Sequence, residues 1–203
     1  MAKIHDLTKG SLAGHFLRLA VPAAIGMVFS TLYNVVDVFF AGLVSTDAQA
    51  GLAISFQAFF VFVTIGFGLS SAMTALVGNA IGAKDTAEAS KTAMQGIGFA
   101  ILASALLIMI ALFLGPHLLA FISTEGAYRD AGTAYFTILL FSLPGFTMGY
   151  GLNGLLQARG DTVSMQYALI GAFFANIGLN PLMMFGIPGI WDGMGFDGIA
   201  AAT

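Results

Sequence analysis

A carboxylate stands in the middle of an apolar stretch near the start of the chain. Residues 31–42 read TLYNVVDVFFAG, and the charges nearest to Asp37 are Arg18 before it and Asp47 after it. A charged side chain inside a bilayer costs several kcal/mol, so one that is kept there marks an ion or proton pathway. Asp37 is therefore a candidate for a group that binds a cation or a proton.

A second polar group interrupts the apolar segment 173–186, FFANIGLNPLMMFG. Asn176 and Asn180 are four residues apart, so a helix places both amides on one face. Pro181 lacks an N–H and leaves the carbonyl near Ile177 without its usual donor. Two amides and a free carbonyl suit a hard cation such as Na⁺, or a proton relay. The alternative is a hydrogen bond between helices, which amides also form in membranes.

The composition indicates what surrounds these groups. The chain has 203 residues, of which 58% are hydrophobic and 8% charged, and its mean hydropathy is +0.92. Soluble domains carry about 25% charged residues. The sequence thus predicts an all-α, polytopic integral membrane protein whose first partner is the lipid bilayer. The net charge of −3 and the scattered basic residues argue against nucleic acid, and the lack of cysteine excludes thiolate metal sites.

Charged residues divide the chain into long neutral intervals, each able to hold one span of about 20 residues. We expect helices near 16–43, 52–77, 92–115, 134–157 and 164–186, and the start of a sixth at Gly198, which the chain end at Thr203 cuts short. Gly193, Gly195 and Gly198 spell G-x-G-x-x-G, but no βαβ pattern surrounds them, so we expect a flexible turn there.

The basic residues predict an orientation, since they concentrate on the cytoplasmic side of membrane proteins. With the N-terminus in the cytoplasm, Arg129 alone falls outside. The others fall inside: Lys3, Lys9, Arg18, Lys84, Lys91 and Arg159. We therefore expect a plasma (inner) membrane protein with a cytoplasmic N-terminus.

On this topology Asp37 and the two asparagines lie at one depth. Asp37 follows Arg18 by 19 residues, and Asn180 follows Asp161 by 19 residues. Both positions are ~28 Å along their helices, in the outer half of the membrane. An acid and two amides at one level suggest a single site, with Na⁺ or H⁺ as its ligand.

Other residues could belong to this site. Ser30, Tyr33 and Asn34 share the helix face of Asp37, which predicts that this face lines a cavity. Pro22 is expected to kink the same helix, and Pro181 the helix of the two asparagines. Tyr135, near the start of the predicted fourth helix, either meets Asp37 or anchors the helix at the membrane interface.

Several segments resemble the multidrug and toxic compound extrusion (MATE) transporters. LAVPAAIGMVFSTLYNVVDVFFAGL is similar to the first helix of that family, including the proline and V-D-x-x-F-x-G. NAIGAKD, QARGDT and ANIGLNPLMMFG are similar to its 2–3 loop, 4–5 turn and fifth helix, and GIAAAT to the start of its sixth. The likeness covers nearly the whole chain in order and spacing.

The resemblance implies a secondary antiporter of about twelve helices in two six-helix lobes, which exports organic cations or amphipathic drugs in exchange for H⁺ or Na⁺. The chain would be the N-terminal lobe, without the C-terminal lobe that completes it. By the same resemblance, ion coupling involves Asp37, Asn176, Asn180, Tyr135 and Thr203. Some members carry an acid where this chain has Asn180, which leaves the coupling ion open.

The sequence leaves three other functions to consider. A lipid-linked precursor flippase of the same superfamily would call for a basic cavity, and this chain has almost no basic residue within its spans. A membrane enzyme would need paired acids, a His or Cys nucleophile system or a metal cluster, and the sequence has none, so no cofactor is expected. The third alternative is a membrane fragment that folds without transporting.

Overall fold

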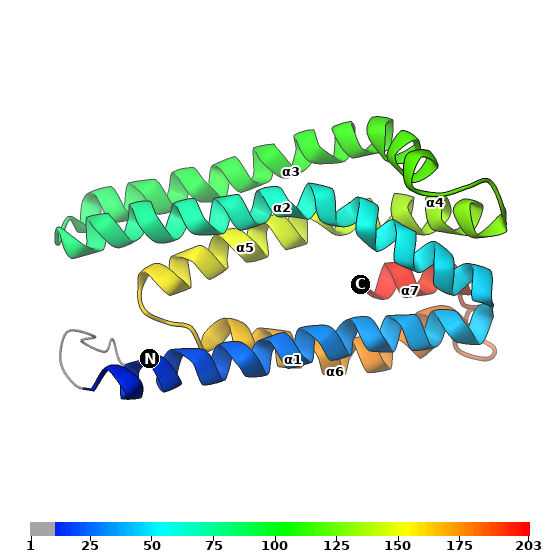
Figure 1. Ribbon diagram of the computed structural model, residues 1–203, viewed down its shortest axis with the longest axis horizontal. Helices are drawn as coiled ribbons and strands as arrows, with labels where there is room; N and C mark the ends of the chain where they lie inside the picture. The colour runs from blue at the N-terminus through cyan, green and yellow to red at the C-terminus, as the bar shows by residue number, and fades with distance from the viewer. Residues whose placement is uncertain (1–10) are drawn as a thin grey trace.

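The computed structural model describes residues 11–203 and, within them, contains helices and no β-strand. Figure 1 shows the arrangement. The helices are α1 (Leu12–Val44), α2 (Thr46–Gly82), α3 (Thr86–Ile122), α4 (Ala127–Leu139), the 3₁₀ turn η1 (Leu140–Ser142), α5 (Leu143–Ala158), α6 (Ser164–Phe185) and α7 (Phe196–Ala202).

Five segments in the described part of the chain are long and apolar enough to cross a membrane. The fourth, Ala127–Ala158, is not the single helix that the sequence predicted over 134–157. Pro144 lacks the N–H that would bond the carbonyl of Leu140 in an α-helix. That carbonyl accepts instead from the N–H of Leu143, and the 3₁₀ turn η1 separates α4 from α5.

The connection between α1 and α2 is also tighter than predicted. A single residue, Ser45, ends α1 and begins α2. Its N–H donates to the carbonyl of Ala41, and its hydroxyl accepts from the N–H of Ala48 at 3.0 Å. Because one serine caps both helices, α2 begins at Thr46 rather than near residue 52.

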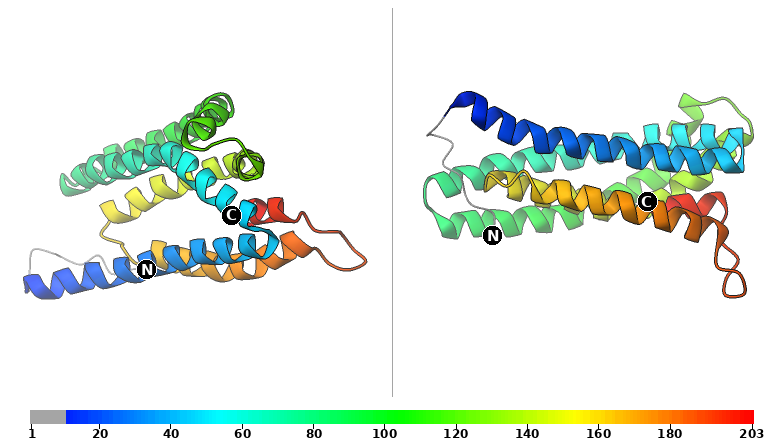
Figure 2. Two further views of the ribbon diagram at one scale, coloured as in Figure 1. Left: turned by 45° about the vertical axis from the view of Figure 1, so that its right-hand side comes forward. Right: turned by 90° about the horizontal axis from the view of Figure 1, so that it is seen from below.

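The helices form two groups that converge at one end (Figures 1 and 2). Helices α2, α3, α4 and α5 pack on one another, and α1 packs along α6. The short helix α7 contacts α1, α4 and α6 where the two groups meet. A core of large buried side chains lies at this meeting point: Leu52, Phe59, Leu119, Phe136, Leu139, Leu143 and Ile199.

The two connections that carry the basic residues Lys84 and Arg159 lie at the same end of the molecule. The α2–α3 turn with Lys84 and the α5–α6 connection with Arg159 are at the end where α1 begins, and the α3–α4 loop is at the other (Figure 1). Lys3 and Lys9 lie outside the described residues.

In the α5–α6 connection, hydrogen bonds from Ser164 hold the pKa of Asp161 below its usual range.

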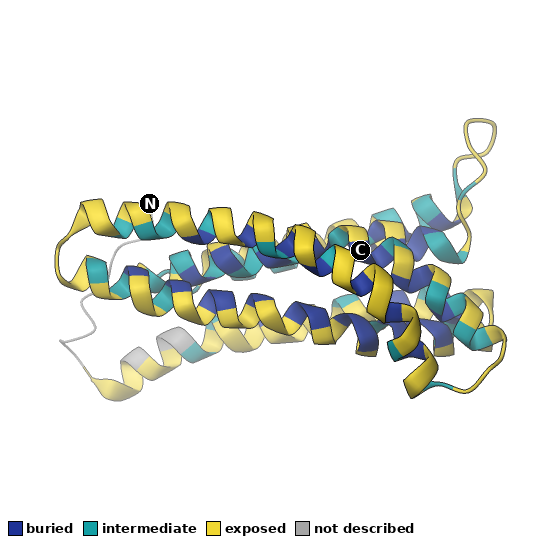
Figure 3. Ribbon diagram, turned by 90° about the horizontal axis from the view of Figure 1, so that it is seen from above, coloured by how far each residue is buried: buried dark blue, intermediate teal, exposed yellow. Residues whose placement is uncertain are grey.

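The outward faces of the helices are apolar and exposed (Figure 3). Large side chains such as Met94, Leu102 and Phe113 are more than two-thirds exposed, at 71%, 73% and 72%. Such surfaces are unfavourable in water but suit hydrocarbon. The fold is that of a membrane protein.

Candidate functional site

The carboxylate of Asp37 is completely buried where α1, α6 and α7 meet. Its Oδ1 accepts hydrogen bonds from the Nδ2 atoms of Asn176 at 2.9 Å and Asn180 at 2.8 Å. Asn176 and Asn180 come from successive turns of α6 and are themselves 1% and 0% exposed. The structure thus joins the acid and the two amides that the sequence placed at one depth.

Thr203 and Tyr33 complete the polar cluster. The Thr203 hydroxyl lies 3.4 Å from Oδ2 of Asp37 and also donates to the carbonyl of Ile199 at 3.1 Å. The Tyr33 hydroxyl lies 3.4 Å from the carbonyl of Thr203. Helix α7 is short, but its contacts with α1 and α6 bring Thr203 to the acid.

Three buried polar atoms around this cluster have no hydrogen-bond partner among the residues that the structure describes: Oδ1 of Asn176, Oδ1 of Asn180 and the hydroxyl of Tyr135. A buried polar group without a partner costs roughly 1–3 kcal/mol. Tyr135 is completely buried between Phe56 and Phe196, so it is no exposed interfacial anchor. The two amide oxygens and the carboxylate are oxygen ligands of the kind that hard cations take.

The remaining predicted residues are distributed differently. Ser30 lines the large cavity described below, whereas Tyr33 and Asn34 are not among its lining residues. Asn34 is exposed, and its amide donates to the carbonyl of Ser30 in the same helix at 2.8 Å. Pro22 and Pro181 both lie inside continuous helices.

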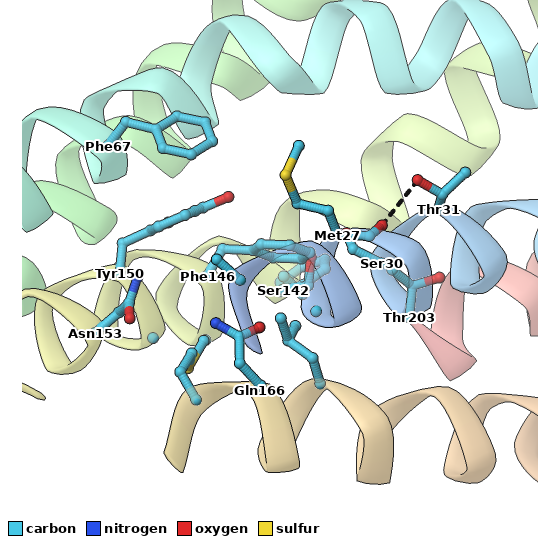
Figure 4. A pocket seen from close by; sticks show the side chains of 17 residues that line it. Met27, Ser30, Thr31, Phe67, Ser142, Phe146, Tyr150, Asn153, Gln166 and Thr203 are labelled. Carbon is cyan, nitrogen blue, oxygen red and sulfur yellow. Dashed lines mark hydrogen bonds between the residues drawn. The ribbon is translucent and has the colours of Figure 1, made fainter. Parts of the chain in front are cut away.

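A cavity of about 810 Å³ separates the α1–α6 pair from η1 and α5. Figure 4 shows the side chains that line this cavity. None of the described side chains that line it carries a formal charge, and its polar groups come from Ser30, Thr31, Ser142, Tyr150, Asn153, Gln166 and Thr203. Thr203 lines the cavity and contacts Asp37, so it connects the cavity to the buried acid.

Aromatic rings form much of the cavity wall opposite α6. Phe67 of α2 packs against Tyr150 of α5 with ring centroids 4.4 Å apart, and Phe146 lies one turn before Tyr150. No pattern in the sequence singles out Phe67, Phe146 or Tyr150. Their spacing on apolar helices resembles that of any lipid-facing aromatic residue, so only the packing of α2 on α5 reveals them.

The chain is similar to known transport proteins. The family model described as MatE matches residues 22–182. A probable multidrug resistance protein NorM of Thermotoga maritima is 28% identical over 92% of this chain and 40% of its own length. The probable multidrug resistance protein YoeA of Bacillus subtilis is 25% identical over 90% of this chain and 40% of its own length. The chain therefore spans about 40% of the length of these curated relatives.

Solved structures agree with the fold. A MOP superfamily transporter of Pyrococcus furiosus superposes with a TM-score of 0.85 at 22% identity, over 100% of this chain and 44% of its own. An outward-facing multidrug resistance MATE transporter superposes with a TM-score of 0.81 at 22% identity, over 93% of this chain and 41% of its own. The all-α fold is thus that of the N-terminal lobe of such transporters. By its match over residues 22–182, the chain belongs to the MatE family.

Proposed function

We propose that this chain is the ion-coupling lobe of a secondary antiporter that exports organic cations or amphipathic drugs in exchange for H⁺ or Na⁺. It acts with a second six-helix lobe and has no enzymatic activity. The coupling ion is a transported substrate, bound by Asp37 with Asn176 and Asn180. Thr203 contacts Asp37, and Tyr135 has a buried hydroxyl without a partner among the described residues; both adjust the site.

The burial of Asp37 supports this proposal most directly. The carboxylate is 0% exposed, and no ion-pair partner for it is found among the described side chains. A proton or Na⁺ neutralises it and so lowers the cost of keeping it enclosed. Without the ion, a hydrated and open arrangement is favoured. An ion gradient can thereby bias which conformation the lobe adopts, because the ion binds the two conformations with different affinity.

The unpartnered amide oxygens support Na⁺ as a ligand of this site. Rotation of both amides turns their oxygens toward the carboxylate side of the cluster, where a cation would hold them. The site then offers only oxygen atoms, which is the ligand set of hard cations. A proton on Asp37 would instead leave both amide oxygens to accept from the acid or from water.

The lining of the cavity supports organic cations or amphipathic drugs as the exported compounds. Its wall combines Phe67, Phe146 and Tyr150 with Met27 and a few neutral polar groups. Aromatic faces attract organic cations, and methionine adapts to varied apolar shapes. A lipid-linked phosphate would require basic groups, and the described lining contains none.

The arrangement of charges supports the membrane and orientation proposed. Lys84, Lys91 and Arg159 belong to connections or helix ends on the side where α1 begins, and Arg129 belongs to the opposite side. We place the first side in the cytoplasm of a cell whose plasma (inner) membrane holds the protein.

Transport assays test the function. The chain joined to its second lobe is reconstituted in liposomes, and export of a fluorescent organic cation is followed while H⁺ and Na⁺ gradients are varied separately. We expect one gradient to accelerate export and its collapse to stop it, and the chain alone to export nothing. Export that ignores both gradients would refute ion coupling.

A further inference from the structure

The connection between α6 and α7 is a small hairpin with an apolar tip. The N–H of Ile187 donates to the carbonyl of Trp191 at 3.0 Å, and the N–H of Trp191 donates to the carbonyl of Ile187 at 3.1 Å. Gly189, at the turn, has a φ of 79°, a conformation that favours glycine. Ile190 beside it is 78% exposed. The sequence predicted only a flexible turn here.

The base of the hairpin is held firmly by α6. The N–H of Met194 donates to the carbonyl of Met183 at 2.8 Å, and the N–H of Gly195 donates to that of Met184 at 3.0 Å. Gly193 lies so close to the backbone of Met184 that a Cβ would collide with it. The hairpin and the end of α6 therefore form one unit, and α7 follows directly.

The direction of the hairpin is informative. Seen from below, it leaves the end of α6 across the direction of the helix axes, on the side away from α1 (Figure 2, right), and the same projection from above shows it from the other side (Figure 3). If the helices cross a bilayer, such a segment extends along the membrane plane rather than into the surrounding water. The exposed side chains of Leu182 and Phe185, at 36% and 61%, continue its apolar surface down α6.

We propose that the hairpin of residues 186–195 lies in the lipid headgroup region at this end of the bilayer, with Trp191 and Ile190 among the headgroups and upper acyl chains. Tryptophan is enriched at that depth because its ring is apolar and its N–H is polar. Asp192 is the one charged residue of the hairpin, and no basic residue is present. The lipid partner is therefore zwitterionic, and binding does not depend on anionic headgroups.

Tryptophan fluorescence tests the proposal, because Trp191 is the single tryptophan of the chain. The 203-residue chain is reconstituted in phosphatidylcholine vesicles that carry bromine either near the headgroup or near the bilayer centre. We expect most of the emission to be lost with the shallow bromine and little with the deep bromine or with aqueous acrylamide. Adding phosphatidylglycerol should leave this pattern unchanged.

A matched control fixes the depth scale. Leu106 of α3 is 56% exposed and ~16 Å along the helix from His117, near the middle of the membrane. In a Trp191→Phe background, Leu106→Trp should be quenched by the deep bromine instead. Strong acrylamide quenching of Trp191 would place the hairpin in water and overturn the proposal. Protection of Trp191 from every quencher would show burial against protein and overturn it equally.

Spin labelling gives a second measurement that leaves Trp191 intact. The chain has no cysteine, so Ile190→Cys and Glu125→Cys each carry a single label. Glu125 lies in the α3–α4 loop at the same end, and its side chain is 94% exposed. The label at residue 190 should collide more with oxygen than with a water-soluble nickel complex, and the label at residue 125 should show the reverse. Equal accessibility of both labels to nickel would contradict the proposal.

Discussion

Asp37 and Asn180 are 143 residues apart in the chain, yet the Asn180 amide donates a 2.8 Å hydrogen bond to the Asp37 carboxylate. The contact links α1 to α6 deep within the protein, where both residues are 0% exposed. A change in the charge of Asp37 is therefore felt by both helices of the pair. This relationship makes Asp37 the first residue to test.

Asp37→Asn should separate folding from transport. The amide keeps the volume of the acid and can still accept from Asn176 and Asn180, so we expect stability to change by no more than about 1 kcal/mol. Export driven by an ion gradient should fall to background, because a neutral group offers the ion no differential affinity. Detergent-solubilised melting and gradient-driven export in the two-lobe transporter measure the two effects.

Asp192→Asn is the matched control for this change. Asp192 is exposed in the α6–α7 hairpin, and its neutralisation should leave export at the level of the unaltered protein. If Asp37→Asn exported at that same level under a fixed gradient, Asp37 would be a structural residue and the proposed coupling would be wrong.

Asn180→Ala should weaken coupling without abolishing it. The substitution removes one of the two amide donors to Oδ1 and leaves Asn176 in place. A hydrogen bond to a charged group contributes about 1.5–3 kcal/mol, so the ion concentration for half-maximal export should shift by roughly tenfold or more. Asn176→Ala should act in the same direction. An unchanged ion dependence in both variants would show that the amides serve only helix packing.

The sequence alone could predict the membrane spans and the level of the site, but not the cavity. Charges at long intervals locate the spans, and equal distances from Arg18 and Asp161 place Asp37 and Asn180 at one depth. The lining by Tyr150 and Gln166 depends on how α5 and α6 diverge, which no local pattern encodes. The break between α4 and α5 was also not predicted. Pro144 removes one backbone hydrogen bond of the helix, and a hydropathy pattern does not show this loss.

Helix ends illustrate a second reason for these differences. The first turn of α2, Thr46–Gln49, is polar and lies outside the helix that the sequence predicts near 52–77. The hydroxyl of Ser45 satisfies a free N–H at the start of that helix, so a polar segment extends it. Capping depends on individual atoms, whereas hydropathy averages over many residues. The predicted helix existed, and its boundary was wrong.

Single-cysteine labelling tests the orientation. Lys84→Cys in the α2–α3 turn and Glu125→Cys in the α3–α4 loop lie at opposite ends of the helices. In intact cells, a reagent that does not cross membranes should label residue 125 at once and residue 84 only after permeabilisation. Labelling of both residues in intact cells would contradict a membrane-spanning arrangement of α3, and labelling of residue 84 alone would reverse the orientation.

Gly154→Ala should loosen the contact between α2 and α5. A Cβ at Gly154 would collide with the backbone carbonyl of Ser70 and lie 2.9 Å from Cβ of Met73, so the helices must separate. Overpacking of this kind costs about 1–3 kcal/mol. Gly149, in the same helix, has open space at the corresponding position, which makes Gly149→Ala the control. The melting temperature in detergent should fall for Gly154→Ala and hold or rise for Gly149→Ala, since alanine favours helix. Equal melting of the two variants would mean that α2 and α5 do not approach as closely as the structure shows.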